Sequence, residues 1–468
     1  MDIIFKPHNM HWLQPDKFKA LDPHLSGLDG LMYVYQYPLL DGMPRETPGI
    51  YSITGGRQVG KTTLLKQYIA KLLDGRVPPR TIAYLPGELL DDHHALVRTA
   101  TSFLDSVNAQ DVAPVYLILD EVTYIKDWDR GIKYLADAGL LRNVIVILTG
   151  SDTVLIRDAR VRFPGRRGRA DRVDFHLFPL SFAEYAGLEK GCSPTAFKEG
   201  LAGYVKPEEL ATLEALFETY LVHGGYLVAI NELASEGSIG RSTFATYADW
   251  IRGDMLKRGK QEHYLREILE AILKRMGSQL TWNTLAGELS INHPATVADY
   301  VELLTRMDAV FVQKALREDK LRGAPKKARK VHFADPFIAH AARAWMNNSD
   351  NPYEQIVKPV LADSETRSAI VESCAASHFN RFYPTFYIKG AGEVDIAYVE
   401  NGRFWPVEVK WARQVRSAEV KQAAKYPNSV IAGRSGLPKQ VHGIPFEPLV
   451  NVLLRLGPSP LWLHDSTG

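Results

Sequence analysis

The first residues of this sequence that could do chemistry form a glycine-rich stretch. It has the pattern G-x-x-x-x-G-K-[ST], in which glycines let a loop curl until backbone N–H groups point at phosphate oxygens. An apolar run precedes the stretch and a helical pattern follows it, which is the context this motif requires. The pattern predicts an ATP·Mg²⁺ site in which Lys61 reaches the β- and γ-phosphates and the Thr62 hydroxyl binds the ion. The cofactor-binding candidates are Gly55, Gly56, Arg57, Gln58, Val59, Gly60, Lys61, Thr62 and Thr63.

Two later apolar runs end in polar residues suited to the same site. VYLIL (115–119) is followed by Asp120 and Glu121, and VIVIL (144–148) is followed by Thr149, Ser151 and Asp152. A carboxylate at the end of a buried strand carries a desolvation cost that Mg²⁺ would offset. We therefore expect Asp120 to hold the ion with Thr62, Glu121 to polarise the attacking water, and Thr149 to sense the γ-phosphate.

A cluster of arginines follows these runs. One of them could neutralise charge on the transferring phosphoryl group, within the subunit or in a neighbour, and Arg166 and Arg169 are the favoured candidates. The alternative is a solvated loop or a site for an acidic partner. The cluster consists of Arg157, Arg160, Arg162, Arg166, Arg167 and Arg169.

The elements that must position these residues are short apolar runs alternating with helical patterns, which predicts an α/β fold with a parallel sheet. Of the 468 residues, 46% are apolar and 24% are charged, as in ordinary soluble globular proteins. Cys192 and Cys374 suggest no disulfide framework. The N-terminus lacks a signal-peptide pattern, and the apolar runs are too short to span a bilayer. We expect a cytoplasmic protein without membrane segments.

Helical patterns dominate after residue 189, and strand-like runs return near residue 355. We expect an ATPase domain (1–189), a helical lid or linker (190–260), a winged helix (261–354) and a C-terminal α/β domain (355–468). In the winged helix, we expect helices at 262–276, 281–290 and 296–307, with Thr281 and Thr296 as N-caps of the second and third. A basic hairpin follows, suited to DNA phosphates or to a subunit contact. Its basic residues are Lys314, Arg317, Lys320, Arg322, Lys326, Lys327, Arg329 and Lys330.

The C-terminal region has a second candidate site. Glu408 and Lys410 lie two residues apart in PVEVKW, so a strand would direct both side chains to one face. Asp395, in GEVDIAYVE, can meet them from an adjoining hairpin strand. Asp395 and Glu408 would hold Mg²⁺, with Glu393 able to assist or replace Asp395, and Lys410 would activate the hydrolytic water. The alternative is a strand pair with an exposed Glu and Lys.

Several segments together resemble a known family. ITGGRQVGKTTLL, LDE, LTGSD, PGRRGR, FPLSFAEY and YLVHGGYLVAI occur in this order. They are similar to prokaryotic AAA+-type ATPases that carry a C-terminal domain of unknown function related to the restriction-endonuclease-like (PD-(D/E)XK) fold. The resemblance implies that Glu372 matches the helix acid of such nucleases. Gln422 and Tyr426 resemble their downstream helix motif.

These expectations combine into a leading hypothesis and two alternatives. The leading hypothesis is an ATP-hydrolysing DNA-binding protein with Mg²⁺-dependent nuclease activity that assembles as a homo-oligomer, possibly a hexamer. The first alternative is a regulatory or signalling ATPase whose nuclease-like domain is a silent docking module. The second is an ATPase that remodels proteins and does not meet nucleic acid.

Overall fold

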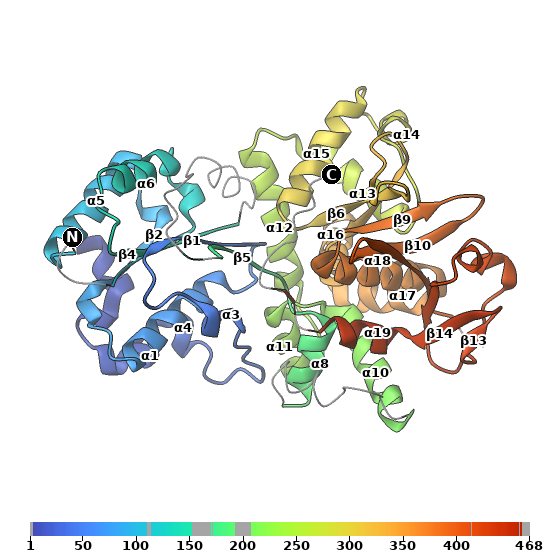
Figure 1. Ribbon diagram of the computed structural model, residues 1–468, viewed down its shortest axis with the longest axis horizontal. Helices are drawn as coiled ribbons and strands as arrows, with labels where there is room; N and C mark the ends of the chain where they lie inside the picture. Colours follow the sequence, from blue (N-terminus) through green and yellow to red (C-terminus); the bar gives the residue numbers. More distant parts are fainter. Residues whose placement is uncertain are drawn as a thin grey trace. The chain divides into compact units, whose positions relative to one another are not determined.

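The computed structural model divides the chain into two compact units, Met1–Phe178 (unit 1) and Pro179–Gly468 (unit 2), and each is described here by itself (Figure 1). No helix among the described residues combines the length and the apolar character that a bilayer crossing requires. The residues that the structure describes are 3–109, 114–151, 170, 172–191, 207–412, 414–457 and 459–460.

Unit 1 is built on a five-stranded parallel sheet with the order β2-β3-β4-β1-β5. All residues of β3 and β4 are buried, as expected for strands covered on both faces. Helix α4 lies on one side of the sheet, and α5 and α6 lie on the other (Figure 1). The predicted parallel α/β sheet is confirmed. Its elements are β1 (Gly49–Gly55), α4 (Lys61–Asp74), β2 (Ile82–Pro86), α5 (His93–Ser106), β3 (Val115–Asp120), α6 (Trp128–Asp137), β4 (Val144–Gly150) and β5 (Asp174–Leu177).

A 3₁₀-helical segment, Ile3–Trp12, covers the edge of this sheet at β2. The Asn9 side chain replaces a missing neighbour strand: its Nδ2 donates to the Tyr84 carbonyl at 2.8 Å, and its Oδ1 accepts from the Tyr84 N–H at 2.7 Å. Because an exposed strand edge invites pairing with other chains, this cap protects the sheet. Nothing in the N-terminal sequence predicted it.

Unit 2 begins with helices, and those predicted at 262–276, 281–290 and 296–307 are present as α13, α14 and α15. Thr281 is the N-cap of α14, as predicted, and its side chain accepts from the Thr284 N–H. The prediction for Thr296 was wrong, because α15 begins at Pro294, whose fixed φ suits a first helical turn. The helices are α8 (Phe182–Glu189), α10 (Pro207–His223), α11 (Leu227–Glu236), α12 (Arg241–Lys257), α13 (Glu262–Lys274), α14 (Trp282–Glu288), α15 (Pro294–Arg306), α16 (Pro336–Asn347), α17 (Lys358–Ala362), α18 (Ser364–Phe382) and α19 (Leu449–Leu456).

A nine-stranded sheet runs through the rest of unit 2, and α18 packs on β8, β10 and β11. The predicted basic hairpin is part of this sheet, because β6 pairs in parallel with β9 through Lys314–Phe386 and Ala315–Tyr387. The segments 261–354 and 355–468 therefore share one sheet, and their separation into two domains stays a prediction. The strands are β6 (Val310–Arg317), β7 (Arg322–Gly323), β8 (Arg329–Phe333), β9 (Thr385–Lys389), β10 (Glu393–Glu400), β11 (Arg403–Lys410), β12 (Val430–Gly433), β13 (Gln440–Val441) and β14 (Ile444–Pro448).

Candidate functional site

The glycine-rich loop joins β1 to α4 in unit 1, and its glycines are needed for backbone reasons. Gly55 has φ +151°, and a Cβ there would lie 2.4 Å from the Leu177 carbonyl oxygen. Gly60 has φ +93°, a left-handed conformation that favours glycine, and α4 begins at the next residue. The helix therefore directs its N-terminal amides, with their partial positive charge, toward the loop.

Lys61 lies at the start of α4 with its side chain only 5% exposed. Its Nζ donates to the carbonyl oxygens of Gly55 at 3.0 Å and Gly56 at 2.8 Å. The same atom lies 3.4 Å from Glu121 Oε1. The ammonium is thus held inside the loop, beside the residue that was expected to polarise water.

Asp120, at the end of β3, collects three hydroxyl groups. Thr62 Oγ1 and the Tyr84 hydroxyl each donate to its Oδ2 at 2.7 Å, and the Thr149 hydroxyl donates to its Oδ1. The structure therefore brings together Thr62, Asp120 and Thr149 from three separate motifs. Carboxylate and hydroxyl oxygens are the protein ligands that Mg²⁺ prefers, so these residues fit the ion. Tyr84 was missed, and the only signal for it was a tyrosine in the apolar run of β2.

Glu121 follows Asp120 in a left-handed conformation with φ +52°. Its N–H donates to Thr149 Oγ1 at 2.9 Å, and its Oε2 accepts from the Ser151 N–H at 3.1 Å. The carboxylate is thereby fixed against the end of β4 and faces a cavity of about 270 Å³. The residues lining this cavity are His24, Arg57, Gln58, Gly60, Lys61, Thr62, Thr63, Glu88, Glu121 and Tyr124, of which His24, Glu88 and Tyr124 were not predicted.

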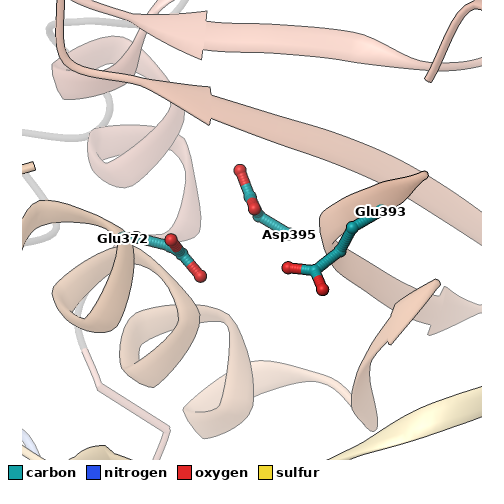
Figure 2. Close-up of side chains that lie close together, drawn as sticks. All are labelled: Glu372, Glu393 and Asp395. Atoms are coloured by element: carbon teal, nitrogen blue, oxygen red, sulfur yellow. The ribbon is translucent and has the colours of Figure 1, made fainter. Parts of the chain in front are cut away.

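Unit 2 contains a second constellation, a cluster of three carboxylates. Glu372 comes from α18, and Glu393 and Asp395 come from one face of β10, with their carboxyl groups directed toward one another (Figure 2). One oxygen from each lies within 4.8 Å of the others. Asp395 and Glu408 were expected to hold Mg²⁺, and of these two only Asp395 belongs to this cluster of described residues. Glu393, expected to assist Asp395, is its neighbour there on β10.

A buried lysine from β8 lies within this carboxylate cluster. Lys330 Nζ is 2.7 Å from Glu372 Oε1, forms an ion pair with Glu393, and is 3.6 Å from Asp395 Oδ1. Burial alone would lower the pKa of Lys330, but the attraction of the three carboxylates raises this pKa above its ordinary value. Burial and the charge of Asp395 raise the pKa of Glu372 to about 7, although Lys330 opposes them.

The backbone around Asp395 is irregular, and one buried amide compensates for it. The pairing of β10 with β9 shifts register between Val394 and Ala397. Gln313 Nε2, from β6, donates to the carbonyls of Phe386 at 3.0 Å and Asp395 at 2.9 Å. Asp395 Oδ2 also accepts from the Val409 N–H at 2.9 Å. These bonds fix the position of the Asp395 carboxylate.

The predicted pair Glu408 and Lys410 forms its own contact on β11, with Lys410 Nζ 2.7 Å from Glu408 Oε1. The Glu408 side chain is 3% exposed. Burial, and then repulsion from Asp395, raise the pKa of Glu408 to about 8, while Lys410 opposes this shift. Attraction to Asp395 and Glu408 outweighs the burial that would lower the pKa of Lys410, so this pKa is raised.

Gln422 and Tyr426 were expected on a helix, but the described chain there forms 3₁₀ turns at Ser417–Val420 and Ala423–Lys425. Gln422 Oε1 accepts from Lys425 Nζ at 2.8 Å and from the Gly392 N–H at 3.3 Å. Gln422 therefore contacts the turn between β9 and β10 and holds a basic side chain above it.

The basic hairpin is less free than its composition suggests. Lys330 is buried in the carboxylate cluster, and the Arg329 guanidinium lies 4.5 Å from the centre of the Trp282 ring. Arg317 lies 3.4 Å from Asp319. The exposed basic residues of the hairpin are Lys314, Lys320, Arg322, Lys326 and Lys327.

Comparison with known proteins agrees with the geometry of unit 1. A family model described as an AAA domain matches residues 47–186, which include the glycine-rich loop, Asp120, Glu121 and Thr149. Residues 47–186 are an AAA-type P-loop ATPase domain. A second family model, a domain of unknown function (DUF8612), matches residues 208–349. It ends before α18 and β9–β11, so the nuclease-like fold stays a prediction.

Two relatives match the chain in sequence, and both are uncharacterized proteins. The one from Haemophilus influenzae is 24% identical over 327 residues, which are 67% of this chain and 74% of the relative. The one from Methanocaldococcus jannaschii is 30% identical over 141 residues, or 29% of this chain and 27% of the relative. Neither extends the assignment beyond the AAA-type domain.

Solved structures share the chain trace only loosely. The Walker-type ATPase PABY2304 of Pyrococcus abyssi has a TM-score of 0.37 and 17% identity over 63% of this chain and 91% of its own. The Aeropyrum pernix ORC1 protein in complex with DNA has a TM-score of 0.31 and 12% identity, over 70% of this chain and 92% of its own. The Thermotoga maritima RuvB Holliday junction branch migration motor has a TM-score of 0.29 and 14% identity, over 60% of this chain and 84% of its own.

Two predicted catalytic residues of the AAA-type domain, Arg166 and Arg169, lie outside the described residues, as does Asp152. Among the described candidates, Lys61, Thr62, Asp120, Glu121 and Thr149 converge on one location. The roles assigned to them stay predictions, to be tested as proposed below.

Proposed function

We propose that the AAA-type domain hydrolyses ATP, with Glu121 orienting and polarising the attacking water. The observation that carries this proposal is the double contact of Thr149, whose hydroxyl bonds to Asp120 and accepts from the Glu121 N–H. One side chain of β4 thus fixes both the expected ion ligand and the expected base. A domain that only bound nucleotide would not need this second acidic residue held beside the loop.

Each residue of the site has a proposed task. The loop amides and Lys61 bind the phosphate tail and orient the γ-phosphate. Thr62 and Asp120 would hold Mg²⁺, which when bound offsets the charge of the β- and γ-phosphates. Glu121, restrained by Ser151 and Lys61, accepts a hydrogen bond from the water and turns it toward phosphorus.

The substitution Glu121→Gln tests this assignment. It keeps the shape of the side chain and removes its charge, so we expect the variant to retain ATP while its turnover falls by roughly 10²-fold or more. Glu88→Gln is the matched control, because Glu88 lines the same cavity but is not among the described residues that hydrogen-bond to Asp120 or Thr149 in this site. Steady-state phosphate release and fluorescent-nucleotide binding are the measurements. Unchanged turnover in Glu121→Gln would mean that another residue orients the attacking water.

We further propose that unit 2 contacts DNA phosphates through the exposed part of the basic hairpin. Lys326 and Lys327 lie side by side in the turn before β8, and both are exposed. Lys320 in the preceding turn and Arg322 on β7 add positive charge, against exposed Glu318 and Asp319. A short run of exposed ammonium groups suits the regularly spaced charges of a nucleic-acid backbone.

DNA binding measured at several salt concentrations tests this contact. Each phosphate contact contributes about −0.9 to the slope of log K against log salt. The double variant Lys326→Ala/Lys327→Ala should therefore bind more weakly and have a slope smaller in magnitude by about 1.8. Lys257→Ala/Lys274→Ala, which removes exposed lysines from α12 and α13, is the control. Equal slopes for wild type and the hairpin variant would assign the basic turn to another role.

For the remainder of unit 2, two functions compete. The first is DNA cleavage. Asp395 and Glu408 would bind a metal ion and Lys410 would activate the hydrolytic water, with Glu372 and Gln422 in support. The ion pairs of Lys330 with the cluster favour the alternative, a catalytically silent docking module. Incubation of wild type and Lys410→Ala with Mg²⁺ or Mn²⁺ and several DNA structures separates the two. Cleavage by wild type that is lost in Lys410→Ala would overturn the silent assignment.

We also propose that the protein assembles as a homo-oligomer, possibly a hexamer, in which Arg166 or Arg169 neutralises phosphate charge in cis or in a neighbouring subunit. Light scattering of Glu121→Gln with ATP gives the mass of the assembly. If turnover per chain rises with protein concentration and Arg169→Ala or Arg166→Ala removes that rise, the arginine acts between subunits.

A further inference from the structure

The carboxylate cluster of unit 2 already contains a cation. The Lys330 side chain is 0% exposed, and its ammonium contacts Glu372 at 2.7 Å, Glu393, and Asp395 at 3.6 Å. Lysine has three N–H donors and no acceptor, so one ammonium can serve three carboxylates. Three partly buried carboxylates in contact would be unfavourable without a counter-ion, and Lys330 supplies that counter-ion.

The same oxygens that lie within 4.8 Å of one another are those a divalent ion would need. Lys330 Nζ lies between these carboxylates, and an ammonium and a divalent cation repel each other at such short range. The two cannot share these carboxylates at contact distance. The cluster therefore does not fit Mg²⁺ while the Lys330 ammonium is in place, although carboxylate oxygens are ligands that Mg²⁺ prefers.

The backbone that carries Lys330 is firmly held. β8 pairs with β6 on both sides of this residue, through Val312–Val331 and Lys314–Arg329, with Gln313 directly opposite Lys330. The Tyr387 hydroxyl donates to the Ala328 carbonyl, and the Tyr387 ring lies 5.7 Å from Lys330 Nζ. The strand pairing thus fixes the backbone from which the lysine side chain enters the cluster.

We propose that Lys330 is the resident cation of the cluster formed by Glu372, Glu393 and Asp395, and that these residues bind a divalent cation only when the ammonium is removed. The site is therefore a built cation site whose occupant is part of the chain. This inference concerns unit 2 alone and does not rest on ATP hydrolysis by the AAA-type domain. It gives the basic hairpin a structural task separate from any contact with DNA.

Substitution of the lysine tests the proposal through metal binding, without any enzymatic readout. Lys330→Met keeps much of the apolar stem and removes the charge. In the full-length protein without nucleotide, we expect this variant to bind about one more Mn²⁺ per chain than wild type, because three carboxylates are left without their cation. We also expect Mn²⁺ to raise its melting temperature more than that of wild type. The measurements are electron paramagnetic resonance of free Mn²⁺ and thermal unfolding with and without the ion.

Matched variants locate the additional ion. Lys327→Met, in the exposed turn of the same hairpin, should bind as much Mn²⁺ as wild type. Adding Glu393→Gln to Lys330→Met should remove the additional ion. A folded Lys330→Met protein that gains no Mn²⁺ overturns the proposal.

A measurement that does not depend on the folding of Lys330→Met completes the test. Glu393→Gln in the otherwise wild-type protein should leave Mn²⁺ binding unchanged, because Lys330 rather than a metal ion occupies the cluster. A loss of about one Mn²⁺ in that variant would show that the wild-type cluster binds the ion beside its lysine, and would overturn the proposal.

Discussion

Thr149 connects the two acidic residues of the ATP site through a single hydroxyl group. It donates to Asp120 and accepts from the backbone N–H of Glu121, and its side chain is fully buried. Because Asp120 also receives hydroxyls from Thr62 and Tyr84, its lone pairs and its position are set by three neighbouring segments. The geometry of the site thus depends on strand ends that are adjacent only in the folded sheet.

The substitution Thr149→Val removes these bonds while keeping the size of the side chain. A buried hydrogen bond to a charged group contributes about 1.5–3 kcal/mol, so we expect turnover to fall by roughly ten- to a hundredfold. Nucleotide affinity should change less, because Lys61 and the loop remain. Thr149→Ser is the control and should keep most of the activity. Turnover of Thr149→Val equal to wild type would mean that the hydroxyl does not position Asp120 or Glu121.

The two glycines Gly224 and Gly225 lie between α10 and α11 in unit 2, and neighbouring atoms leave no room for a side chain there. A Cβ on Gly225 would lie 2.1 Å from the Leu180 carbonyl oxygen and 2.5 Å from the Leu180 nitrogen, both backbone atoms that cannot move alone. The Gly225 N–H also donates to the buried Asp335 carboxylate at 2.8 Å, and Asp335 caps α16. The two glycines of the YLVHGGYLVAI motif thus allow three elements to pack closely.

We therefore expect Gly225→Ala to destabilise unit 2 by at least about 1–3 kcal/mol, the usual cost of overpacking. Gly253→Ala is the matched control: it lies within α12 with nothing near the new Cβ, and should be neutral or stabilising by about 0.5–1 kcal/mol. Urea unfolding of both variants is the measurement. An unchanged midpoint for Gly225→Ala would contradict the close approach to Leu180.

Buried histidines should make unit 2 sensitive to acid. Burial, followed by the charge of Arg343, lowers the pKa of His340 on α16 to about 3, so the folded state keeps this ring neutral. Between pH 6.5 and 3 the unfolded chain binds a proton that the folded chain does not, so stability is lost as pH falls through this window. His223, His332 and His378 are shifted in the same direction by burial.

The substitution His340→Gln isolates one of these contributions. Near pH 5 the free energy of unfolding should depend on pH less steeply than in wild type, by about 1.4 kcal/mol per pH unit. The exposed His293→Gln serves as the control. Urea unfolding at several pH values gives both slopes, and equal slopes for His340→Gln and wild type would mean that the folded state protonates this ring.

The sequence was informative wherever a local pattern decides the structure. The apolar runs before Gly55, Asp120 and Thr149 predicted the parallel strands, because residues buried on both faces leave a continuous hydrophobic signal. Long-range pairing was not predictable in this way. No local pattern shows that β6 pairs with β9, or that Lys330 is buried although Lys326 and Lys327 of the same basic run are exposed. Thr296 failed as a cap because Pro294 competes for the helix start.

For the whole molecule, the two units support the proposed functions to different degrees. Unit 1 brings together the glycine-rich loop, the expected ion ligands Thr62 and Asp120, and Glu121, and the AAA family model covers all of them. In unit 2 the nuclease-like pattern is present in order along the chain, but a lysine occupies the carboxylate cluster. The proposed ATPase with a catalytically silent second unit accounts for both observations.

We propose that the loop from Gly55 to Thr62 and the Asp120–Thr149 pair bind ATP with Mg²⁺. Equilibrium binding of a fluorescent ATP analogue, with and without Mg²⁺, tests it most directly in wild type, Lys61→Ala and Lys71→Ala. Lys71 lies on the same helix near its other end and is the matched control. We expect Mg²⁺-dependent binding by wild type and Lys71→Ala, and an affinity lower by at least roughly a hundredfold in Lys61→Ala. Equal binding by Lys61→Ala and wild type would contradict it.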